Sequence, residues 1–246
     1  MTRVAVDALT PGEAARARTL AAELELPLKE EGPYTFLLRV TPQRLELLEP
    51  QRREKPLYAD FSAGKVGYRS AQRAREPLVR AVGVRGKYRP AVIDATAGLG
   101  QDAFVLASAG CQVTLIERSG IIAALLADGL ARAHRNPATA ESASRMDLLS
   151  GDANELLSGL SADTVYLDPM YPETGKTAAK TKTMRIFRAL VGEDADADEL
   201  LRSALSAATK RVVVKRPLKA PLLGAEAPSS SLRGKTTRFD IYPRTP

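Results

Sequence analysis

The chain has 246 residues, of which 44% are apolar and 26% are charged, proportions ordinary for a globular protein of one or two domains. Its single cysteine, Cys111, excludes an internal disulfide and favours a reducing environment. The longest apolar helix-like run, residues 121–127, is far too short to cross a bilayer, and no secretory signal is recognisable. We therefore expect a cytoplasmic protein that does not contact a membrane.

Residues 1–57 differ in pattern from the rest of the chain and predict a small N-terminal α+β part. Thr10 and Pro11 form a helix start, with Thr10 as the cap and Pro11 in the first turn. The other expected elements are a strand at 4–6, paired strands at 34–40 and 44–48, and a linker at 49–56. We expect this part to dock RNA, so its deletion should weaken RNA binding but leave cofactor binding in place.

Residues 58–246 alternate between helix-like and strand-like segments. Such alternation predicts an α/β fold of the Rossmann-like kind, with a mostly parallel, doubly wound sheet. The expected helices are 75–82, 102–109, 121–134, 184–191 and 197–208, and the expected strands are 91–95, 112–116, 146–149, 164–168, 211–215 and 239–242. Residues 64–69 read as a flexible basic segment, and residues 227–231 read as a loop.

The first clear strand of this region runs into a glycine loop, DATAGLGQDAF, at residues 94–104. Gly98 and Gly100 allow a tight turn and the close approach of a ligand, and the following helix directs free N–H groups at an anion. The loop also fits the loose dinucleotide pattern, although a strand-to-helix turn often needs glycine for packing alone. Asp94, Gly98 and Gly100 are therefore candidate cofactor-binding residues.

Acidic residues follow the next two strands. Glu117 comes 19 residues after Gly98, where a carboxylate accepts the two hydroxyl groups of a ribose; a surface ion pair with Arg118 fits it equally well. Asp152 is placed to meet an adenine amine, and it is also a good helix N-cap. Together with the glycine loop, these acids indicate an adenosine-containing cofactor, and both NAD and S-adenosylmethionine satisfy that description.

The segment YLDPMYP, residues 166–172, favours methyl transfer to an exocyclic base amine. The Asp168 carboxylate and the Pro169 carbonyl each accept one amine hydrogen and stabilise the positive charge that develops on the nitrogen. Tyr171 supplies a flat face on which a splayed-out base stacks. These three residues are the candidate catalytic residues. A strand-ending Asp-Pro turn with a core tyrosine is the alternative for the dipeptide alone.

The positive charge of the chain is concentrated beside this segment. The formal net charge is +7, and residues 206–246 contain nine basic but only two acidic residues. Charge alone indicates only a well-solvated surface, but two basic runs that flank a candidate active site favour nucleic acid. The candidate RNA-binding residues are Lys176, Lys180, Lys182, Arg185, Lys210, Arg211, Lys215 and Arg216.

Five ordered segments resemble the ribosomal RNA small subunit methyltransferase J family: DATAGLG, the pair ER at 117–118, YLDPMYP, TKRVVVKRP at 209–217 and RFDIY at 238–242. The resemblance covers residues 58–246. It implies an S-adenosylmethionine-dependent methyltransferase that modifies the N2 amine of a guanine in 16S rRNA. The implied cofactor contacts are Gln101, Asp102, Glu117, Arg118, Asp152, Ala153 and Asp168. The chain departs from the family pattern at Gln101, where arginine is usual, and at residues 152–153, where two small hydroxyl residues are typical.

The expected protein is thus an rRNA methyltransferase that uses S-adenosylmethionine, releases S-adenosylhomocysteine, needs no metal and acts on 16S rRNA or the small ribosomal subunit. An NAD(P)-dependent oxidoreductase would share the glycine loop and Glu117. It would also need a proton relay, and the only histidine, His134, is poorly placed for one. A non-catalytic RNA-binding protein would not need Asp168 and Pro169. An amino-methyltransferase that acts on DNA or another RNA remains an alternative of the same class.

Overall fold

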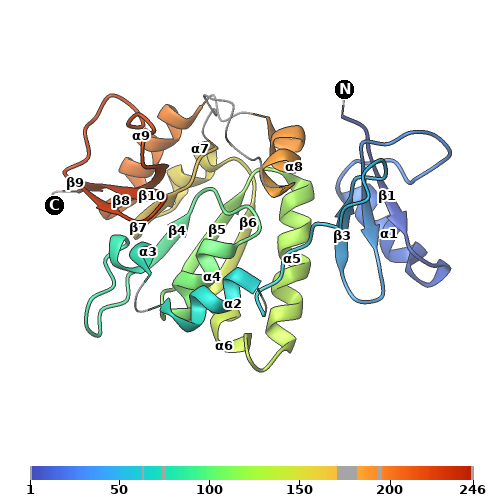
Figure 1. Cartoon of the computed structure of the whole chain (residues 1–246), viewed down its shortest axis with the longest axis horizontal. Coiled ribbons are helices and arrows are strands. Elements are labelled where there is room, and N and C mark those ends of the chain that lie inside the picture. The colour runs from blue at the N-terminus through green and yellow to red at the C-terminus, as the bar shows by residue number, and fades with distance from the viewer. Residues whose placement is uncertain (1, 63, 74–75, 171–181, 193–195, 245–246) are drawn as a thin grey trace.

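The structure is a computed structural model that describes residues 2–62, 64–73, 76–170, 182–192 and 196–244 (Figure 1). A small unit at the N-terminal end of the chain lies beside a larger α/β unit (Figure 1). None of the helices within the described ranges is long and apolar enough to cross a membrane.

The N-terminal unit is a three-stranded sheet with one helix, as the sequence predicts. Its elements are β1 (Val4–Ala8), η1 (Pro11–Glu13), α1 (Ala14–Glu23), β2 (Phe36–Val40) and β3 (Leu45–Leu48). Strand β2 lies in the middle, parallel to β1 and antiparallel to β3. The Glu13 carboxylate accepts a hydrogen bond from the backbone N–H of Thr10 at 3.1 Å, which fixes the helix start. The boundary at residue 57 stays a prediction.

The larger unit is built on a seven-stranded sheet in the order β6-β5-β4-β7-β8-β10-β9. Strands β4 to β8 pair in parallel, whereas β10 is antiparallel to both of its neighbours. The strands are β4 (Val92–Asp94), β5 (Val113–Glu117), β6 (Met146–Ser150), β7 (Ala162–Leu167), β8 (Ala208–Pro217), β9 (Ser230–Arg233) and β10 (Thr237–Pro243). This arrangement confirms the mostly parallel sheet of a Rossmann-like fold.

Helices cover both faces of this sheet, so two hydrophobic cores form. Alternate residues of one strand face opposite sides: in β8, Val213 belongs to one core, and Val212 and Val214 to the other. Helices α4 and α5 pack on the first face and α7 and α9 on the second. The helices are α2 (Gly64–Ala71), α3 (Pro77–Ala81), α4 (Gln101–Ser108), α5 (Gly120–Arg135), α6 (Ala140–Ala143), α7 (Ala153–Leu156), η3 (Leu157–Gly159), α8 (Lys182–Val191) and α9 (Ala197–Ala207).

The N-terminal unit shares a core with the larger unit and is not a loosely tethered appendage. Phe36 and Leu38 of β2 belong to the same hydrophobic cluster as Leu125 of α5. A Cβ atom at Gly129 of α5 would lie 2.5 Å from the Cβ atom of Ala59, so this close approach requires glycine. Arg132 Nη2 also donates to the Ala59 carbonyl at 2.5 Å. The connection after β3 is therefore pinned to α5.

Two segments differ from expectation. Residues 64–69, expected to be flexible, lie within helix α2, where Val66 is buried. The expected loop at 227–231 overlaps the edge strand β9, which begins at Ser230 and pairs with β10. In both cases packing or strand pairing supplies order that local composition does not encode.

Candidate active site

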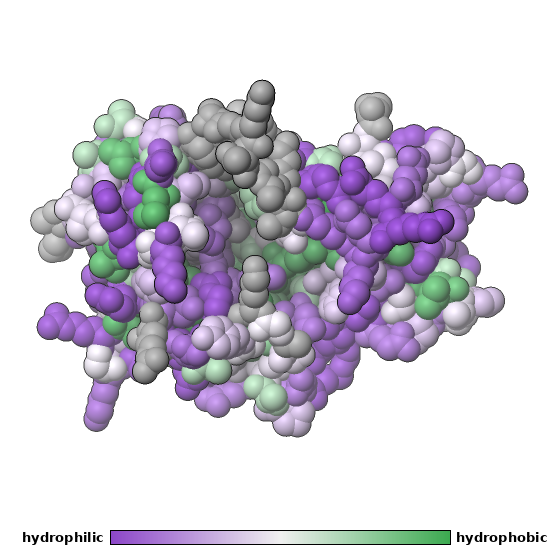
Figure 2. Space-filling view, viewed as in Figure 1, coloured by the Kyte–Doolittle hydropathy of each residue, from purple (hydrophilic) through white to green (hydrophobic). Residues whose placement is uncertain are grey.

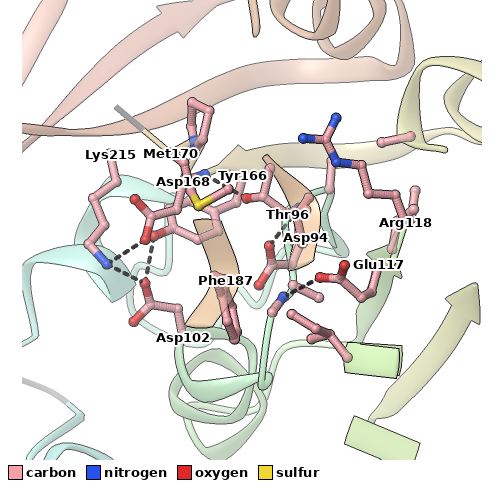
Figure 3. A pocket seen from close by; sticks show the side chains of 18 of the residues that line it. Asp94, Thr96, Asp102, Glu117, Arg118, Tyr166, Asp168, Met170, Phe187 and Lys215 are labelled. Carbon is pink, nitrogen blue, oxygen red and sulfur yellow. Dashed lines mark hydrogen bonds and ion pairs between the residues drawn. The ribbon is translucent and has the colours of Figure 1, made fainter. Parts of the chain in front are cut away.

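A cavity of about 400 Å³ lies at the carboxyl ends of β4, β5 and β7. Its lining comes from the glycine loop, the start of α7, the residues after β7 and helix α8. Figure 3 shows two polar groups in it: Asp102, Asp168 and Lys215 on one side, and Glu117 and Arg118 on the other. Figure 2 shows that hydrophilic side chains cover most of the face seen in Figure 1.

The glycine loop connects β4 to α4, and its two glycines are required by different neighbouring side chains. Both have left-handed backbone angles, with φ of +55° at Gly98 and +70° at Gly100, a conformation that favours glycine. A Cβ atom at Gly100 would lie 2.7 Å from Leu126 Cδ1, so Gly100 is required for core packing. A Cβ atom at Gly98 would meet the cavity-lining ring of Phe187 at 3.0 Å. The absence of a side chain at Gly98 therefore lets the Phe187 ring pack against the glycine loop.

Glu117 is the last residue of β5 and supports the glycine loop. Its Oε2 accepts the N–H of Gly98 at 2.9 Å (Figure 3). Its Oε1 accepts the N–H of Ser119 at 2.8 Å. The residue is only 7% exposed and lines the cavity, which argues against a surface glutamate. Arg118 is exposed and directs Nη1 at Asp196 Oδ1 at 3.3 Å.

The residues expected at the adenine level lie at the start of α7. Asp152 caps this helix by accepting the Asn154 N–H at 2.8 Å, so its expected role as an N-cap is confirmed. Asp152 and the buried Ala153 both line the cavity, so Asp152 can contact a cofactor there as well as cap the helix. Gln101 is the exposed first residue of α4 and lines the same cavity.

Asp168 follows β7 at the mouth of the cavity. Its backbone N–H donates to Thr96 Oγ1 at 2.6 Å, which ties the end of β7 to the glycine loop. The next residue, Pro169, is buried and lines the cavity with Met170. Tyr171, the expected base-stacking residue, lies outside the described residues.

Lys215, expected on an RNA surface, is inside this cavity. Its Nζ contacts Asp168 Oδ2 at 2.8 Å and Asp102 Oδ2 at 2.9 Å. Asp102 Oδ2 also accepts the Tyr166 hydroxyl at 2.6 Å, and Asp102 Oδ1 accepts Arg69 Nη1 at 2.6 Å. Two cations and a phenol therefore surround one carboxylate.

The acidic groups of the cavity differ in ionisation. Burial opposes ionisation of Asp102, but the charges of Lys215 and Arg69 outweigh it and hold the pKa of Asp102 well below its ordinary value. Burial raises the pKa of Asp168, Lys215 lowers it and Asp102 raises it, so its pKa lies above the ordinary value. Burial and Asp102 likewise raise the pKa of Asp94 well above its ordinary value. Asp102 is therefore firmly ionised, whereas Asp94 and Asp168 protonate more readily than an ordinary aspartate.

The structure separates the remaining expected RNA-binding residues. The Arg185 guanidinium is bound to Glu49 and to Glu54, at 2.7 Å from the latter, so it ties α8 to the linker. Arg216 is 4% exposed and donates to the Pro221 carbonyl at 3.1 Å. Because a phosphate does not reach a buried guanidinium, Arg216 is better described as a structural residue. Lys182 lies on α8, and Lys176 and Lys180 fall outside the described residues.

Lys210 and Arg211 lie at the opposite end of the sheet from the cavity. In the parallel β7–β8 pair, Arg211 is level with Thr164 near the start of β7, whereas Val214 is level with Leu167 at its end. Lys210 Nζ pairs with Asp163 Oδ1 at 3.0 Å. The two residues therefore do not flank the site, contrary to expectation.

Sequence reasoning did not place Thr96, Tyr166, Phe187 or Lys215 in this cavity, and it named Arg69 only as part of the basic segment at 64–69. The signal for Tyr166 was present, because a tyrosine in an otherwise apolar buried strand needs a hydroxyl partner. Lys215 follows a run of β-branched residues, and the side of the sheet to which its side chain points depends on the register of β8. Arg69 and Phe187 reach the cavity only through helix packing.

Comparisons with known proteins agree with this geometry. Residues 19–244 match a family model described as putative SAM-dependent methyltransferase. The chain is 48% identical over 250 residues to ribosomal RNA small subunit methyltransferase J of Thioalkalivibrio sulfidiphilus, with 98% of each chain covered. It is 49% identical over 236 residues to the protein of that name from Nitrosococcus oceani, with 92% of each chain covered.

A solved structure gives the same result for the fold. A SAM-dependent methyltransferase from Neisseria gonorrhoeae superposes with a TM-score of 0.76 at 36% identity, covering 98% of this chain and 95% of that one. The oxidoreductase and the non-catalytic RNA-binding protein are therefore set aside. The chain belongs to the ribosomal RNA small subunit methyltransferase J family of SAM-dependent methyltransferases.

Proposed function

We propose that this protein transfers the methyl group of S-adenosylmethionine to the N2 amine of a guanine in 16S rRNA. The observation that carries the proposal is the position of Asp168 and Pro169, at the mouth of a cavity whose floor is the glycine loop. Near full-length similarity to proteins named for this ribosomal RNA activity supports it. Such a reaction belongs in the cytoplasm.

The described residues fit S-adenosylmethionine. Gly98 presents only backbone to the cavity, beside the packed ring of Phe187. The Glu117 carboxylate lies in the cavity, where its remaining lone pairs suit the hydroxyl groups of a ribose. Ile116, Ile122 and Leu200 add apolar lining that suits an adenine ring. Asp152 and Asn154 supply polar atoms at the same level.

Asp168 and Pro169 prepare the substrate nitrogen. When bound, S-adenosylmethionine supplies a methyl group made electrophilic by its sulfonium. The guanine amine is a weak nucleophile because its lone pair is delocalised into the ring. The Asp168 carboxylate and the Pro169 carbonyl each accept one amine N–H, which orients that lone pair and stabilises the developing positive charge. As the N–C bond forms and the C–S bond breaks, the nitrogen loses one proton to solvent.

Exposed cations near the cavity suit the RNA backbone. Lys219 lies on the segment that follows β8, Arg233 is the last residue of β9, and Lys235 lies on the segment that follows β9. The Leu218 N–H donates to the Thr236 carbonyl at 3.3 Å, so these segments meet next to the cavity-lining Pro217. Arg238 stabilises the first segment by donating to the carbonyls of Leu218 at 2.9 Å and Ala220 at 2.8 Å. Together with Lys182, the three cations form the proposed RNA surface.

The test is transfer of a tritiated methyl group to 16S rRNA from cells that lack this enzyme, both as free RNA and in small subunits. Nuclease digestion and mass spectrometry of the labelled nucleoside then identify the product. We expect N2-methylguanosine from 16S rRNA, and none from 23S rRNA or duplex DNA. A labelled adenine, or preferential labelling of either control nucleic acid, would replace this proposal with that of another amino-methyltransferase.

A further inference from the structure

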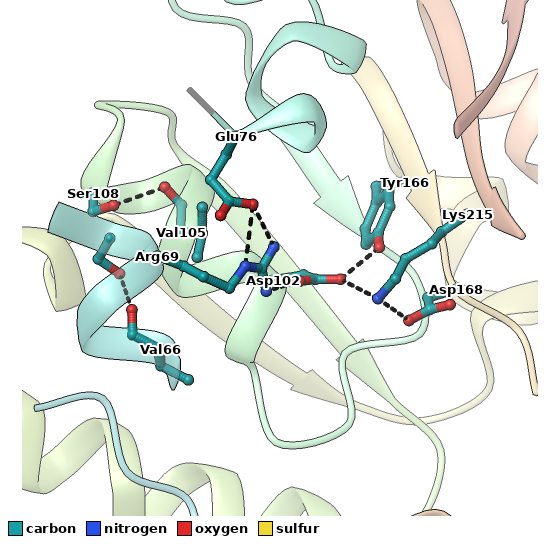
Figure 4. A network of polar contacts seen from close by, with 10 residues as sticks. Val66, Arg69, Glu76, Asp102, Val105, Ser108, Tyr166, Asp168 and Lys215 are labelled. Carbon is teal, nitrogen blue, oxygen red and sulfur yellow. Dashed lines mark hydrogen bonds and ion pairs between the residues drawn. The ribbon is translucent and has the colours of Figure 1, made fainter. Parts of the chain in front are cut away.

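The side chain of Lys215 joins the proposed catalytic carboxylate to a second carboxylate. Asp168 comes from the end of β7, Asp102 from the first turn of α4, and Lys215 from β8 between them in space (Figure 4). The ammonium contacts Oδ2 of both acids, at 2.8 Å in Asp168 and 2.9 Å in Asp102. The side chain of Lys215 is 25% exposed, against 40% for Asp168. Asp168 is therefore the more solvent-accessible member of this pair.

The groups behind Lys215 hold it in place. Arg69 Nη1 donates to Asp102 Oδ1 at 2.6 Å, and Arg69 Nη2 pairs with Glu76 Oε2 at 3.0 Å. Glu76, Arg69, Asp102, Lys215 and Asp168 thus form a row of alternating charge (Figure 4). The Tyr166 hydroxyl adds a hydrogen bond of 2.6 Å to Asp102. Asp102 thus accepts three hydrogen bonds from protein groups, so it anchors the lysine.

The two oxygens of Asp168 have different surroundings. Oδ2 is held by Lys215. Among the residues that the structure describes, none forms a hydrogen bond with Oδ1. The backbone N–H of Asp168 is fixed on Thr96, so the carboxylate is restrained at both its main chain and one oxygen.

We propose that Lys215 is a positioning residue for methyl transfer, which holds Oδ2 of Asp168 so that Oδ1 accepts the substrate amine. The inference rests on the proposed function, because it assigns Asp168 the amine. It differs from the expectation that Lys215 binds a phosphate, since an ammonium held by two carboxylates faces the cavity.

Charge is the second contribution of Lys215. The groups that face Asp168 are Asp94, Asp102, Tyr166, Arg69 and Lys215. Without Lys215, two neighbouring acids would oppose ionisation of Asp168, with Arg69 the remaining cation. Because an acid whose pKa rises loses its carboxylate form at higher pH, the acid limb of the activity profile must then move upward.

The experiment compares Lys215→Met, Lys215→Gln and Lys215→Arg with the control Lys29→Met, which removes an exposed lysine of the N-terminal unit. We expect Lys215→Met to lower kcat at pH 7 by about 10–100-fold and to move the acid limb of kcat/KM upward by about one pH unit or more. Lys215→Gln should behave alike. Lys215→Arg should return the acid limb to its wild-type pH, because the positive charge is kept. It should not return kcat to the wild-type value, because a planar guanidinium cannot occupy the same position as a compact ammonium.

A phosphate-binding role gives a different result: KM for RNA rises, its salt dependence weakens, and kcat and the acid limb stay unchanged. That outcome, or an unmoved acid limb with any loss of kcat, overturns the proposal. The carboxyl ¹³C resonance of Asp168, assigned with Asp168→Asn, gives a readout independent of turnover and should titrate at higher pH in Lys215→Met and Lys215→Gln. If the wild-type protein methylates no RNA, the proposed function fails, and this titration still decides the electrostatic role of Lys215.

Discussion

The two ends of the parallel sheet hold their charged residues in different surroundings. At the carboxyl end, Asp102 and Asp168 point into a cavity and both pair with Lys215, at 2.9 and 2.8 Å. At the amino end, Arg85 and Lys87 of the turn before β4 are exposed, and no ion pair of theirs is found in the described part of the chain. Charge inside a cavity acts on chemistry, whereas exposed charge acts on encounter with a polyanion.

Strand β8 shows how the fold sorts residues that the sequence groups together. Lys210 and Lys215 are five residues apart, which in a strand corresponds to about 17 Å. One pairs with Asp163 at the start of β7, and the other with Asp168 just after its end. A basic run in a strand is therefore not a basic patch on the surface. Substitutions of charged residues at each end of the sheet test this difference in role.

The largest effect is expected from Asp168→Asn at the carboxyl end. The amide keeps the shape of the side chain but loses the charge that stabilises the developing cation, so kcat should fall by about 10²–10⁴-fold. Calorimetric titration with S-adenosylhomocysteine should show an affinity within a few-fold of wild type. Asp147→Asn, on the exposed side of β6, is the matched control and should retain activity. Full activity of Asp168→Asn would remove this residue from the chemistry.

A large effect on stability is expected from Asp102→Asn, because it leaves Lys215 and Arg69 without their shared partner. Breaking such a pair should lower the free energy of unfolding by about 3 kcal/mol at pH 7. The pKa of Asp102 is lowered in the folded state, so its contribution is fully present above the unfolded value of about 3.9, begins to decrease there and is lost as pH falls through the folded-state pKa. Urea unfolding at pH 7, 5 and 3.5 measures this. A difference between wild type and variant that does not shrink at pH 3.5 would contradict the assignment.

An intermediate effect is expected from Glu117→Gln. A carboxylate that accepts two backbone N–H groups holds the glycine loop, and an amide has only one oxygen to do so. Loss of one charged hydrogen bond, with an N–H group left unsatisfied, should weaken S-adenosylhomocysteine binding by about 10–100-fold. Glu155→Gln, on the exposed face of α7, is the control. Equal affinities in calorimetry would mean that Glu117 only shapes the loop.

The sequence predicted most of the fold because buried parallel strands carry their own signal. Strands β4 to β8 are apolar runs separated by helix-like segments, and each was expected within a few residues of its observed position. Strand β9 was missed because Ser230 and Ser231 have little strand propensity, and their order comes from pairing with β10. Helix α2 was missed because Gly64 and Gly67 weaken it, and Val66 stabilises it through burial in the core.

The site was predictable only where local spacing determined it. Gly98 and Glu117 belong to adjacent strand ends, so the loop and its acid followed from the pattern of two neighbouring strands. Lys215 is 113 residues from Asp102 and 47 from Asp168. Their meeting depends on strand order, register and the direction of one side chain. No one of these is encoded near residue 215, so the basic run was read as surface charge.

The smallest effect is expected from removing the exposed charges at the amino end of the sheet, compared with removing those of the proposed RNA surface. If RNA binds over the cavity, Lys219→Ala/Arg233→Ala/Lys235→Ala should weaken rRNA binding about tenfold or more. The slope of log affinity against log salt should become shallower by about one for each phosphate that the variant no longer neutralises. Arg85→Ala/Lys87→Ala should cost less than about threefold, because exposed charges beyond a Debye length of about 8 Å are largely screened. Filter binding of 16S rRNA across a salt series measures both. An equal or larger loss from the Arg85/Lys87 pair would show that the RNA extends past the cavity along the whole sheet, and both ends would then belong to one binding surface.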